Sequence, residues 1–276
     1  MSDAAGKTVL ITGSTDGLGR ATALELAAGG ATVLVHGRDP ARVESTAAEV
    51  VRAGGERAAR SYVADLASLE EVRRLAEQVK DREDRLDVLM SNAGVTRRSR
   101  EESADGYELT FAVNYLSHFL LTGLLLPLLE RSAPARIVNV ASIGQSPIDF
   151  EDVMLERGYD PMRAYSQSKL AQIMFTFELA ERLRRRGVDG VTVNALHPAT
   201  LMDTKMVRES YGRAMTSVQE GVDATVRLAV APELDGVTGQ YFDGQRESRA
   251  NAQAYDPGAR ERLWELSERL TGVRFP

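Results

Sequence analysis

A tyrosine and a lysine stand four residues apart in the segment RAYSQSKLAQ (163–172), which otherwise reads as a helix. Four residues turn an α-helix by about 400°, so Tyr165 and Lys169 share one face, one turn apart. A phenol beside an ammonium can serve as a general acid and base, because the positive charge favours the phenolate. An isolated pair of this kind is more often an ordinary surface pair, so the rest of the chain has to decide between the two interpretations.

A second candidate site is the glycine-rich segment ITGSTDGLGR (11–20), which follows a predicted strand and opens a predicted helix. Gly13, Gly17 and Gly19 have the spacing T-G-x-x-x-G-x-G. Such a turn lets the backbone approach a pyrophosphate, and the helix N-terminus favours the negative charge. The alternative is a flexible turn without a ligand, but its place after the first strand of an alternating chain favours a dinucleotide site.

Short apolar runs alternate with longer amphipathic segments along the whole chain. The short runs are rich in β-branched residues and show little polar alternation, which is typical of strands buried on both faces. They are TVLITG (8–13), TVLVHG (32–37), LDVLMSNAG (86–94), RIVNVAS (136–142) and VTVNALHP (191–198), with a weaker ARSYVA (59–64) and GQYFDG (239–244) as the last edge strand.

Helix signals lie between these runs. Asp39 before Pro40 predicts an N-cap and a first helical position, and Ser68 with Glu71 has the spacing of a capping box. Regular alternation of strands and helices predicts an α/β fold with a doubly wound parallel sheet and right-handed crossovers. We find no linker or repeat, so we expect a single domain over residues 1–276.

The composition is that of a soluble globular protein, with 43% apolar residues, 27% charged residues and a net charge of −6. This acidic balance argues against nucleic acid and anionic membranes as main partners. The chain has no cysteine, and His36, His118 and His197 lack metal-ligand spacing, so no metal site is predicted. The longest apolar run, residues 119–129, is too short to span a bilayer, and the first strand leaves no room for a signal peptide. We therefore expect a cytoplasmic protein without a membrane anchor.

Six motifs follow one another along the chain: TGSTDGLG, NAG (92–94), Asn114, NVAS ending at Ser142, YSQSK and HPATLMDT (197–204). With these motifs in register, the chain resembles the short-chain dehydrogenase/reductase family over essentially its whole length. It looks most like the retinol-dehydrogenase-like branch, through the long insert between Ser142 and Tyr165, the stretch YDPMRAYSQSKLAQ and the late GVTGQYFDG…RLWELSERLTG. The resemblance implies a Rossmann fold in which that insert builds the substrate pocket.

The resemblance also implies roles for individual residues. Tyr165 would be the general acid/base, while Lys169 would lower the phenol pKa from its usual value near ~10 and bind the nicotinamide ribose. Ser142 would hydrogen-bond the substrate oxygen, and Asn114 would hold a water that connects Lys169 to solvent. The other residues that the resemblance places around the cofactor are Gly13, Ser14, Thr15, Gly17, Leu18, Gly19, Asp65, Leu66, Asn92, Ala93, Gly94, Pro198, Thr200 and Thr204.

Cofactor choice depends on the segment VLVHGRDP (33–40). NAD-preferring sites place a carboxylate at the end of the second strand, where it binds the ribose 2′-hydroxyl. The family pattern puts Gly37 at that position, and Arg38, which could bind a 2′-phosphate, follows it. We expect Asp39 to cap a helix, so the sequence predicts NADP(H) in preference to NAD(H). The alternative is that Arg38 is only solvated.

Two positions depart from the family pattern. Ala199 follows Pro198 where the family often has glycine, so strain is expected if a glycine conformation is needed there. Arg20 stands where an apolar residue is common, and it could reach either phosphate or solvent.

The sequence thus predicts an NADP(H)-dependent oxidoreductase that interconverts a carbonyl and an alcohol. A non-catalytic nucleotide sensor or scaffold is the alternative, and the complete Asn114, Ser142, Tyr165 and Lys169 set argues against it. The oligomeric state stays open, a homo-oligomer included, and retinoid or steroid chemistry is not implied. We expect a hydrophobic small-molecule substrate from the apolar residues around the predicted pocket, which are Ile143, Ile148, Phe150, Val153, Leu201, Met202, Met206 and Val207.

Overall fold

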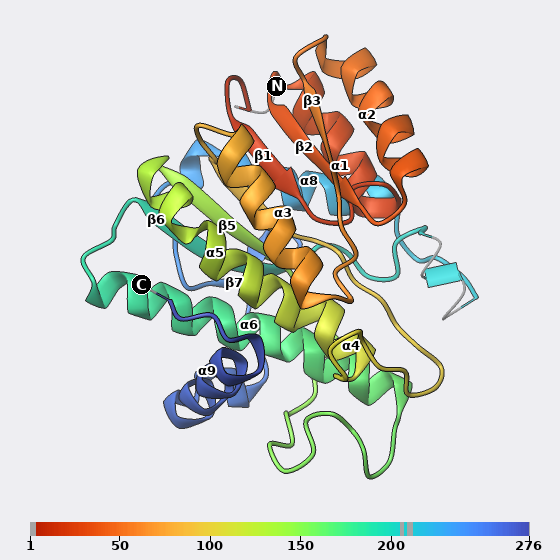
Figure 1. Cartoon of the computed structure of the whole chain (residues 1–276), viewed down its shortest axis with the longest axis vertical. Helices are drawn as coiled ribbons and strands as arrows, with labels where there is room; N and C mark the ends of the chain where they lie inside the picture. The colour runs from red at the N-terminus through yellow and green to blue at the C-terminus, as the bar shows by residue number, and fades with distance from the viewer. Residues whose placement is uncertain (1–3, 205–206, 209–211, 276) are drawn as a thin grey trace.

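The computed structural model describes residues 4–204, 207–208 and 212–275, and a twisted sheet runs through the middle of this part of the chain (Figure 1). The strand order is β3-β2-β1-β4-β5-β6-β7-β8, with every pair parallel except β7 and β8. The strands are β1 (Thr8–Ile11), β2 (Thr32–Gly37), β3 (Ala59–Val63), β4 (Val88–Ser91), β5 (Ala135–Val140), β6 (Val191–His197), β7 (Tyr241–Asp243) and β8 (Arg246–Glu247).

Helices cover both faces of this sheet, which confirms the predicted doubly wound α/β fold. One face carries α1 (Gly17–Ala28), α2 (Pro40–Gly54) and α8 (Val218–Val230). The other face carries α3 (Leu69–Arg82), α5 (Ser117–Arg131) and α6 (Pro161–Arg185). Shorter pieces are α4 (Leu109–Phe111), the π-helical η1 (Ala112–Leu116) and the 3₁₀ turns η2 (Pro232–Leu234) and η3 (Ala252–Tyr255), and α9 (Pro257–Thr271) follows them.

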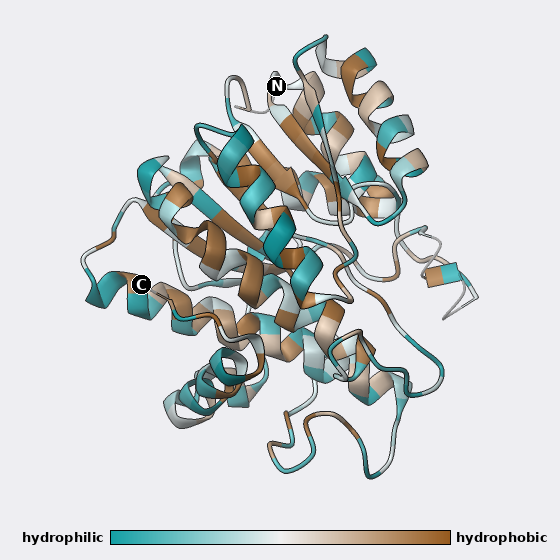
Figure 2. Cartoon of the chain, in the orientation of Figure 1, coloured by the Kyte–Doolittle hydropathy of each residue, from teal (hydrophilic) through white to brown (hydrophobic). Residues whose placement is uncertain are grey.

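The strands divide the apolar core into two halves. Leu10 of β1 faces α3 and α5, whereas its neighbours Val9 and Ile11 face α1 and α8. All three side chains are fully buried, because parallel strands between two helical layers expose neither face to water. Figure 2 shows apolar colour along the central strands and along α5, with polar residues on the outer surfaces of α2 and α3.

Most of the local predictions are confirmed, with two corrections. Asp39 caps α2 by accepting hydrogen bonds from the backbone N–H groups of Ala41 and Arg42. The capping box at α3 is only half formed, because the Glu71 carboxylate accepts from the N–H of Asp65 at 2.7 Å. β7 is also not the edge strand, since the two-residue β8 folds back against it.

The helical stretch Leu109–Arg131 is long and apolar enough to cross a membrane, judged by length and composition alone. Within the described residues it is the one stretch with this property, and 89% of its most apolar window is buried inside the protein. It lies between the sheet, α3 and α6, so its apolar surface is covered by protein. A helix that is apolar on all sides is expected at such a place in a core.

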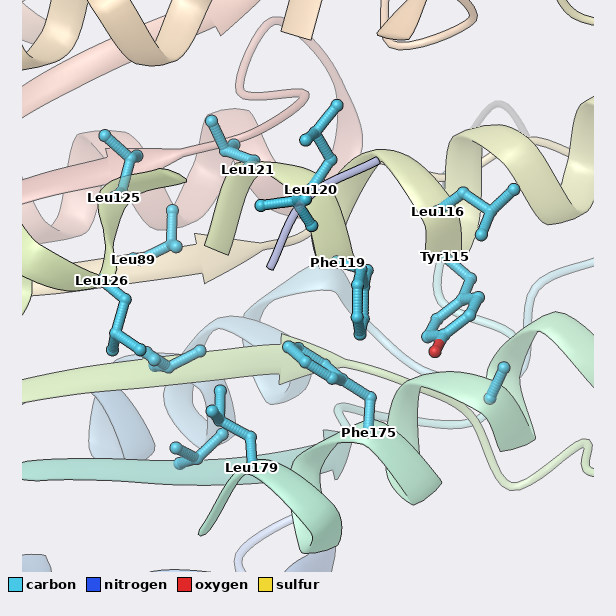
Figure 3. Packing of buried hydrophobic residues seen from close by; sticks show 14 of the residues in the cluster. Leu89, Tyr115, Leu116, Phe119, Leu120, Leu121, Leu125, Leu126, Phe175 and Leu179 are labelled. Atoms are coloured by element: carbon cyan, nitrogen blue, oxygen red, sulfur yellow. The ribbon is translucent and has the colours of Figure 1, made fainter. Parts of the chain in front are cut away.

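The C-terminal segment covers the outer side of α5 and α6. Trp264 of α9 stacks on Phe175 of α6, with ring centroids 5.9 Å apart, and meets Phe119 of α5 edge-on at 5.2 Å. Figure 3 shows Phe119, Phe175 and Tyr115 converging between the two helices. The Tyr115 hydroxyl in η1 hydrogen-bonds the Ser267 hydroxyl of α9 at 2.7 Å. α6 is therefore buried on nearly every side.

We expect the substitution Trp264→Ala to lower the free energy of unfolding by about 3–5 kcal/mol, because it leaves a cavity among Phe119, Phe175 and Phe275. Urea denaturation followed by circular dichroism measures this loss. Arg274→Ala is the control on the same segment, since it removes only the exposed guanidinium that pairs with Glu268 and should cost less than about 1 kcal/mol. Equal effects of the two changes would contradict the packing role of Trp264.

Candidate active site

The strand order reverses between β1 and β4, and the predicted site residues gather at the carboxyl edge of the sheet around this point. The glycine turn follows β1, Asn92–Gly94 follow β4, and Ser142 follows β5. The HPATLMDT segment follows β6. Ligands of open α/β sheets bind in the crevice at such a switch point.

Lys169 is 4% exposed and lies beside the Tyr165 ring, with its Nζ 5.7 Å from the ring centroid. The ammonium donates hydrogen bonds to the Val140 carbonyl at 2.8 Å and to Gln172 Oε1 at 2.9 Å. Burial lowers the pKa of Lys169 to about 7. The structure thus brings the two predicted residues to one site, with a desolvated cation next to a half-buried phenol ring.

Ser142 lies at the end of β5, where several hydrogen bonds fix its backbone. Its carbonyl accepts from the Tyr241 hydroxyl at 3.1 Å and from Gln145 Nε2 at 2.9 Å. Its hydroxyl accepts from the N–H of Gly144 at 3.0 Å. A Cβ on Gly144 would lie 3.5 Å from the Ser142 hydroxyl and 3.8 Å from that of Ser166, so both hydroxyls flank the same glycine. Ser166 directly follows Tyr165, which places Ser142 near the start of α6.

Asn114 lies in the π-helical turn η1, and its amide is fully engaged by protein. Oδ1 accepts from the N–H of Val95 at 2.7 Å, and Nδ2 donates to the Val95 carbonyl and the Ser168 hydroxyl. A Cβ on Gly94 would contact both Asn114 Oδ1 at 3.5 Å and Lys169 Nζ at 3.7 Å. The side chain therefore ties the loop after β4 to α6, and the backbone carbonyl of Asn114 accepts from His118 Nδ1 at 3.0 Å. The water that the sequence analysis placed at Asn114 stays a prediction.

The glycine turn has the close packing that a dinucleotide site requires. Gly13 and Gly17 have φ values of 66° and 48°, which only glycine adopts readily. A Cβ on Gly19 would lie 2.4 Å from Asn92 Nδ2 and from the Gly13 carbonyl, so this residue has no room for a side chain. Gly17 and Gly19 leave the first turn of α1 open, while the Asp16 carboxylate caps the helix by accepting from the N–H of Gly17 at 2.7 Å. The close backbone approach at the glycines fits a bound pyrophosphate.

The loop after β6 folds over this turn, because a Cβ on Gly17 would lie 3.3 Å from Thr204 Cγ2. The Ser14 hydroxyl accepts from the N–H of His36 and ties the turn to β2. The other predicted cofactor residues lie along the same edge: Thr15 beside Gly37, Leu18 buried at the start of α1, Asp65 and buried Leu66 after β3, Ala93 bonded to Thr12 Oγ1, buried Pro198, and exposed Thr200.

Arg38 is exposed at the end of β2 and has no hydrogen-bond or ion-pair partner among the described residues. A Cβ on Gly37 would lie 2.7 Å from Thr15 Cγ2 and 3.0 Å from Thr15 Oγ1, so a carboxylate could not stand there without displacing Thr15. Arg42 pairs with Asp16 at 2.8 Å and so offsets its negative charge beside the turn. The Asp39 carboxylate caps α2, as predicted.

Both departures from the family pattern have structural answers. Ala199 has no positive φ, whereas Leu201 has a φ of 47°. The strain expected at Ala199 therefore lies two residues later, where a non-glycine residue in the left-handed region costs about 1 kcal/mol. Arg20 forms an ion pair with Glu49 of α2, so its guanidinium is directed toward that helix.

The three histidines hold the backbone of the crevice, a function that the sequence analysis missed. His36 Nδ1 accepts from the N–H of Gly13 at 3.1 Å, and His197 Nε2 bonds the Thr200 hydroxyl at 3.1 Å. His118 joins the Thr12 hydroxyl, at 2.9 Å from Nε2, to the Asn114 carbonyl, at 3.0 Å from Nδ1. A carbonyl only accepts, so Nδ1 of His118 carries the proton. The sequence could have indicated this function by position, since His36 and His197 lie at the ends of predicted strands.

The insert between Ser142 and Tyr165 is irregular and partly belongs to the core. Ile148 and Val153 are 3% and 7% exposed and pack in the α5/α6 half of it. Met202 packs against Gly221 of α8, and Met206 lies outside the described residues. A cavity of about 250 Å³ adjoins Ser142, and it is lined by Ile143, Gln145, Tyr241, Asp243, Ser248, Arg249, Ala250 and Asn251. Polar residues therefore outnumber the apolar ones there.

Acidification should destabilise the protein through two of the histidines. Burial lowers the pKa of His36 to about 4 and that of His118 to about 3, so between these values and about 6.5 only the unfolded chain binds the protons. The free energy of unfolding should therefore fall by up to about 3 kcal/mol per pH unit below pH 6. Urea titrations at several pH values measure this slope. His36→Asn should roughly halve it, and a stability that is flat from pH 7 to 5 would contradict the assignment.

Comparisons with known proteins agree with this geometry. The sequence profile described as short chain dehydrogenase matches residues 7–213. Mouse retinol dehydrogenase 13 is 41% identical over 285 residues, covering 97% of this chain and 84% of the relative. Human retinol dehydrogenase 14 is 40% identical, covering 97% of this chain and 87% of the relative.

Solved structures show the same fold. A crystal structure of an uncharacterized protein from Mycobacterium paratuberculosis superimposes with a TM-score of 0.82 at 34% identity, covering 99% of this chain and 96% of the other. The Pseudomonas aeruginosa RhlG/NADP active-site complex has a TM-score of 0.71 at 28% identity, covering 87% and 94%. The chain thus belongs to the short-chain dehydrogenase/reductase family, in its retinol-dehydrogenase-like branch.

Proposed function

We propose that this short-chain dehydrogenase/reductase interconverts a carbonyl and an alcohol with NADP(H), and that Tyr165 transfers the proton. The observation that carries the proposal is the buried Lys169 ammonium beside the Tyr165 ring, at the edge where the glycine turn meets the loops after β4 and β6. The relatives named above are retinol dehydrogenases, and their chemistry is of this class. The bound cofactor supplies or accepts the hydride.

The protein's own residues then handle the proton and the substrate oxygen. The positive charge of Lys169 favours the phenolate of Tyr165 and so lowers the barrier to proton transfer at the phenol oxygen. The Ser142 hydroxyl, on a loop fixed by Tyr241 and Gln145, is available to hydrogen-bond the substrate oxygen. The loop after β4, held by Asn114, closes the crevice on the side of Gly94.

A nucleotide sensor without turnover would need the glycine turn but not this cation. Burying an ammonium costs free energy, and the lowered pKa of Lys169 reflects that cost. A sensor would gain nothing from keeping such a group beside a phenol, so the site favours catalysis.

NADP(H) preference is supported by three features at the end of β2. Arg38 is exposed and without a described partner, Asp39 is engaged in capping α2, and Gly37 is closed to a carboxylate by Thr15. A guanidinium makes charge-assisted, bidentate bonds to phosphate. Several similar solved structures are NADP or NADPH complexes, which is consistent with this preference.

For the substrate, we propose a small hydrophobic carbonyl or alcohol compound. Ile143 is 57% exposed directly after Ser142, where an apolar ligand could cover it. Ile148 and Val153 are withdrawn into the core, and the cavity beside Ser142 is mainly polar. The compound therefore needs a hydrogen-bonding end as well as an apolar body. Localisation in the cytoplasm remains a prediction, to be checked by cell fractionation.

Tyr165→Phe should lower kcat about 10²–10⁴-fold, because it removes the proton donor while keeping the ring over Lys169. The affinity for NADPH, measured by fluorescence titration, should stay nearly unchanged. Turnover is measured with a panel of aldehydes and ketones. Tyr107→Phe is a matched control, since its hydroxyl only donates to the Leu270 carbonyl, and it should keep full activity. Near-full activity of Tyr165→Phe would refute the proposed mechanism.

Arg38→Ala should lower kcat/KM for NADPH by at least about tenfold and leave that for NADH nearly unchanged, because only NADPH carries the 2′-phosphate. Steady-state kinetics with both cofactors give the ratio. Arg57→Ala is the control, since Arg57 is also exposed but precedes β3 at the opposite edge of the sheet. Gly37→Asp is a poorer test, because the new Cβ would collide with Thr15. A wild-type preference for NADH would overturn the assignment.

A further inference from the structure

The hydrogen bonds that Lys169 forms with the described residues use two of its three N–H donors. An ammonium has three N–H donors and no acceptor. Among the described residues, the Val140 carbonyl takes one at 2.8 Å and Gln172 Oε1 takes another at 2.9 Å. The third N–H is therefore the one left for a ligand or for Tyr165, and the two protein acceptors determine where it points.

Gln172 is an unusual residue for its position. It lies three residues after Lys169 on α6 and is 1% exposed. Its Nε2 has no hydrogen-bond partner among the described residues. A buried, unpaired amide group costs about 1–3 kcal/mol, so an apolar side chain would serve packing better. Because an ammonium can only donate, the oxygen of this amide faces Lys169, and that contact is what the residue gains.

We propose that Gln172 is a positioning residue, which together with the Val140 carbonyl holds the Lys169 ammonium charged and turns its third N–H toward the reaction site. The consequence for turnover rests on the function proposed above, whereas the contact with Lys169 does not. Val140 contributes a backbone carbonyl that substitution cannot remove, so Gln172 is the acceptor that a mutation can change.

The charges around Lys169 show why two neutral acceptors matter. The titratable groups that face it are Tyr165 on α6, His118 on α5 and His197 on β6. The ammonium contributes to lowering the pKa of both histidines, so neither stabilises it. No carboxylate among the described residues raises the pKa of Lys169, and burial is the cause that lowers it. The two carbonyl dipoles therefore supply part of the stabilisation that a carboxylate would normally provide.

Two substitutions should move the Lys169 pKa in opposite directions. Gln172→Leu keeps the volume and removes the acceptor, so it should lower the pKa by about one unit or more. Gln172→Glu supplies a carboxylate in the same place and should raise it by a similar amount. If Gln172 only filled space, the two substitutions would not shift the Lys169 pKa in opposite directions.

The titration can be observed directly in the protein without cofactor. The chain has only four lysines, Lys7, Lys80, Lys169 and Lys205, so ¹³C labelling of lysine gives four ε-carbon signals. The signal lost in Lys169→Met identifies the site. Gln167→Leu is the control, because Gln167 is a buried α6 glutamine that donates to the Val153 carbonyl and should leave the titration unchanged.

A downward shift in Gln172→Leu with an upward shift in Gln172→Glu supports the proposal. Unchanged midpoints, or shifts in the same direction, overturn it. If Gln172→Leu does not fold, Gln172→Asn shortens the side chain by one methylene and should give a smaller downward shift.

A kinetic experiment tests the link to turnover. At pH 8, Gln172→Leu should reduce carbonyl turnover about tenfold, and lowering the pH by about one unit should restore it. If the Gln172 variants shift the Lys169 midpoint as expected but the wild-type protein turns over no carbonyl, the contact between Gln172 and Lys169 is supported. Only the proposed function is then refuted.

Discussion

A buried ammonium with no neighbouring carboxylate in the described part of the chain is the constraint around which this structure is arranged. Lys169 lies almost fully inside the protein, where burial lowers its pKa to about 7. Desolvating a cation is costly, and here two neutral oxygens offset part of the cost. A carboxylate would hold the charge more firmly but would also cancel its field at Tyr165. The site therefore keeps the cation poorly compensated, which leaves its potential available to the phenol.

Such a cation needs rigid surroundings, and these come from elements far apart in the sequence. α9 and the last residues cover α6 from outside, so the helix that carries Tyr165 and Lys169 is packed on both sides. The Tyr115–Ser267 hydrogen bond joins this C-terminal cover to the π-helical turn that carries Asn114. On the cofactor side, His118 links that turn to Thr12 at the end of β1. The backbone of the crevice is thus fixed by neutral side chains before any ligand binds.

The sequence by itself determined the fold class, and it predicted which residues lie together at the carboxyl edge of the sheet. Buried parallel strands need continuous apolar runs, and those runs located the sheet. Glycines are required where backbone meets backbone, as at Gly13 and Gly19, so their spacing revealed the turn. Tyr165 and Lys169 were paired by helical geometry alone, which depends only on local backbone hydrogen bonds. The N-cap at Asp39 depends on equally local hydrogen bonds, so the sequence predicted correctly that this carboxylate binds the start of α2.

Only the tertiary structure decided features that depend on long-range contacts. The Glu71 carboxylate bonds the N–H of Asp65 and not that of Ser68, because the strand end before α3 brings the Asp65 backbone within reach. Ile148 and Val153 joined the core because η3 and α6 cover the insert, with Gln253 binding the Ile148 backbone. His36 and His118 acquired their roles from Gly13 and Thr12, which lie on other elements, whereas His197 bonds Thr200 only three residues away. The charge state of Lys169 likewise follows from its burial, and burial is a property of the packed fold that no spacing of residues encodes.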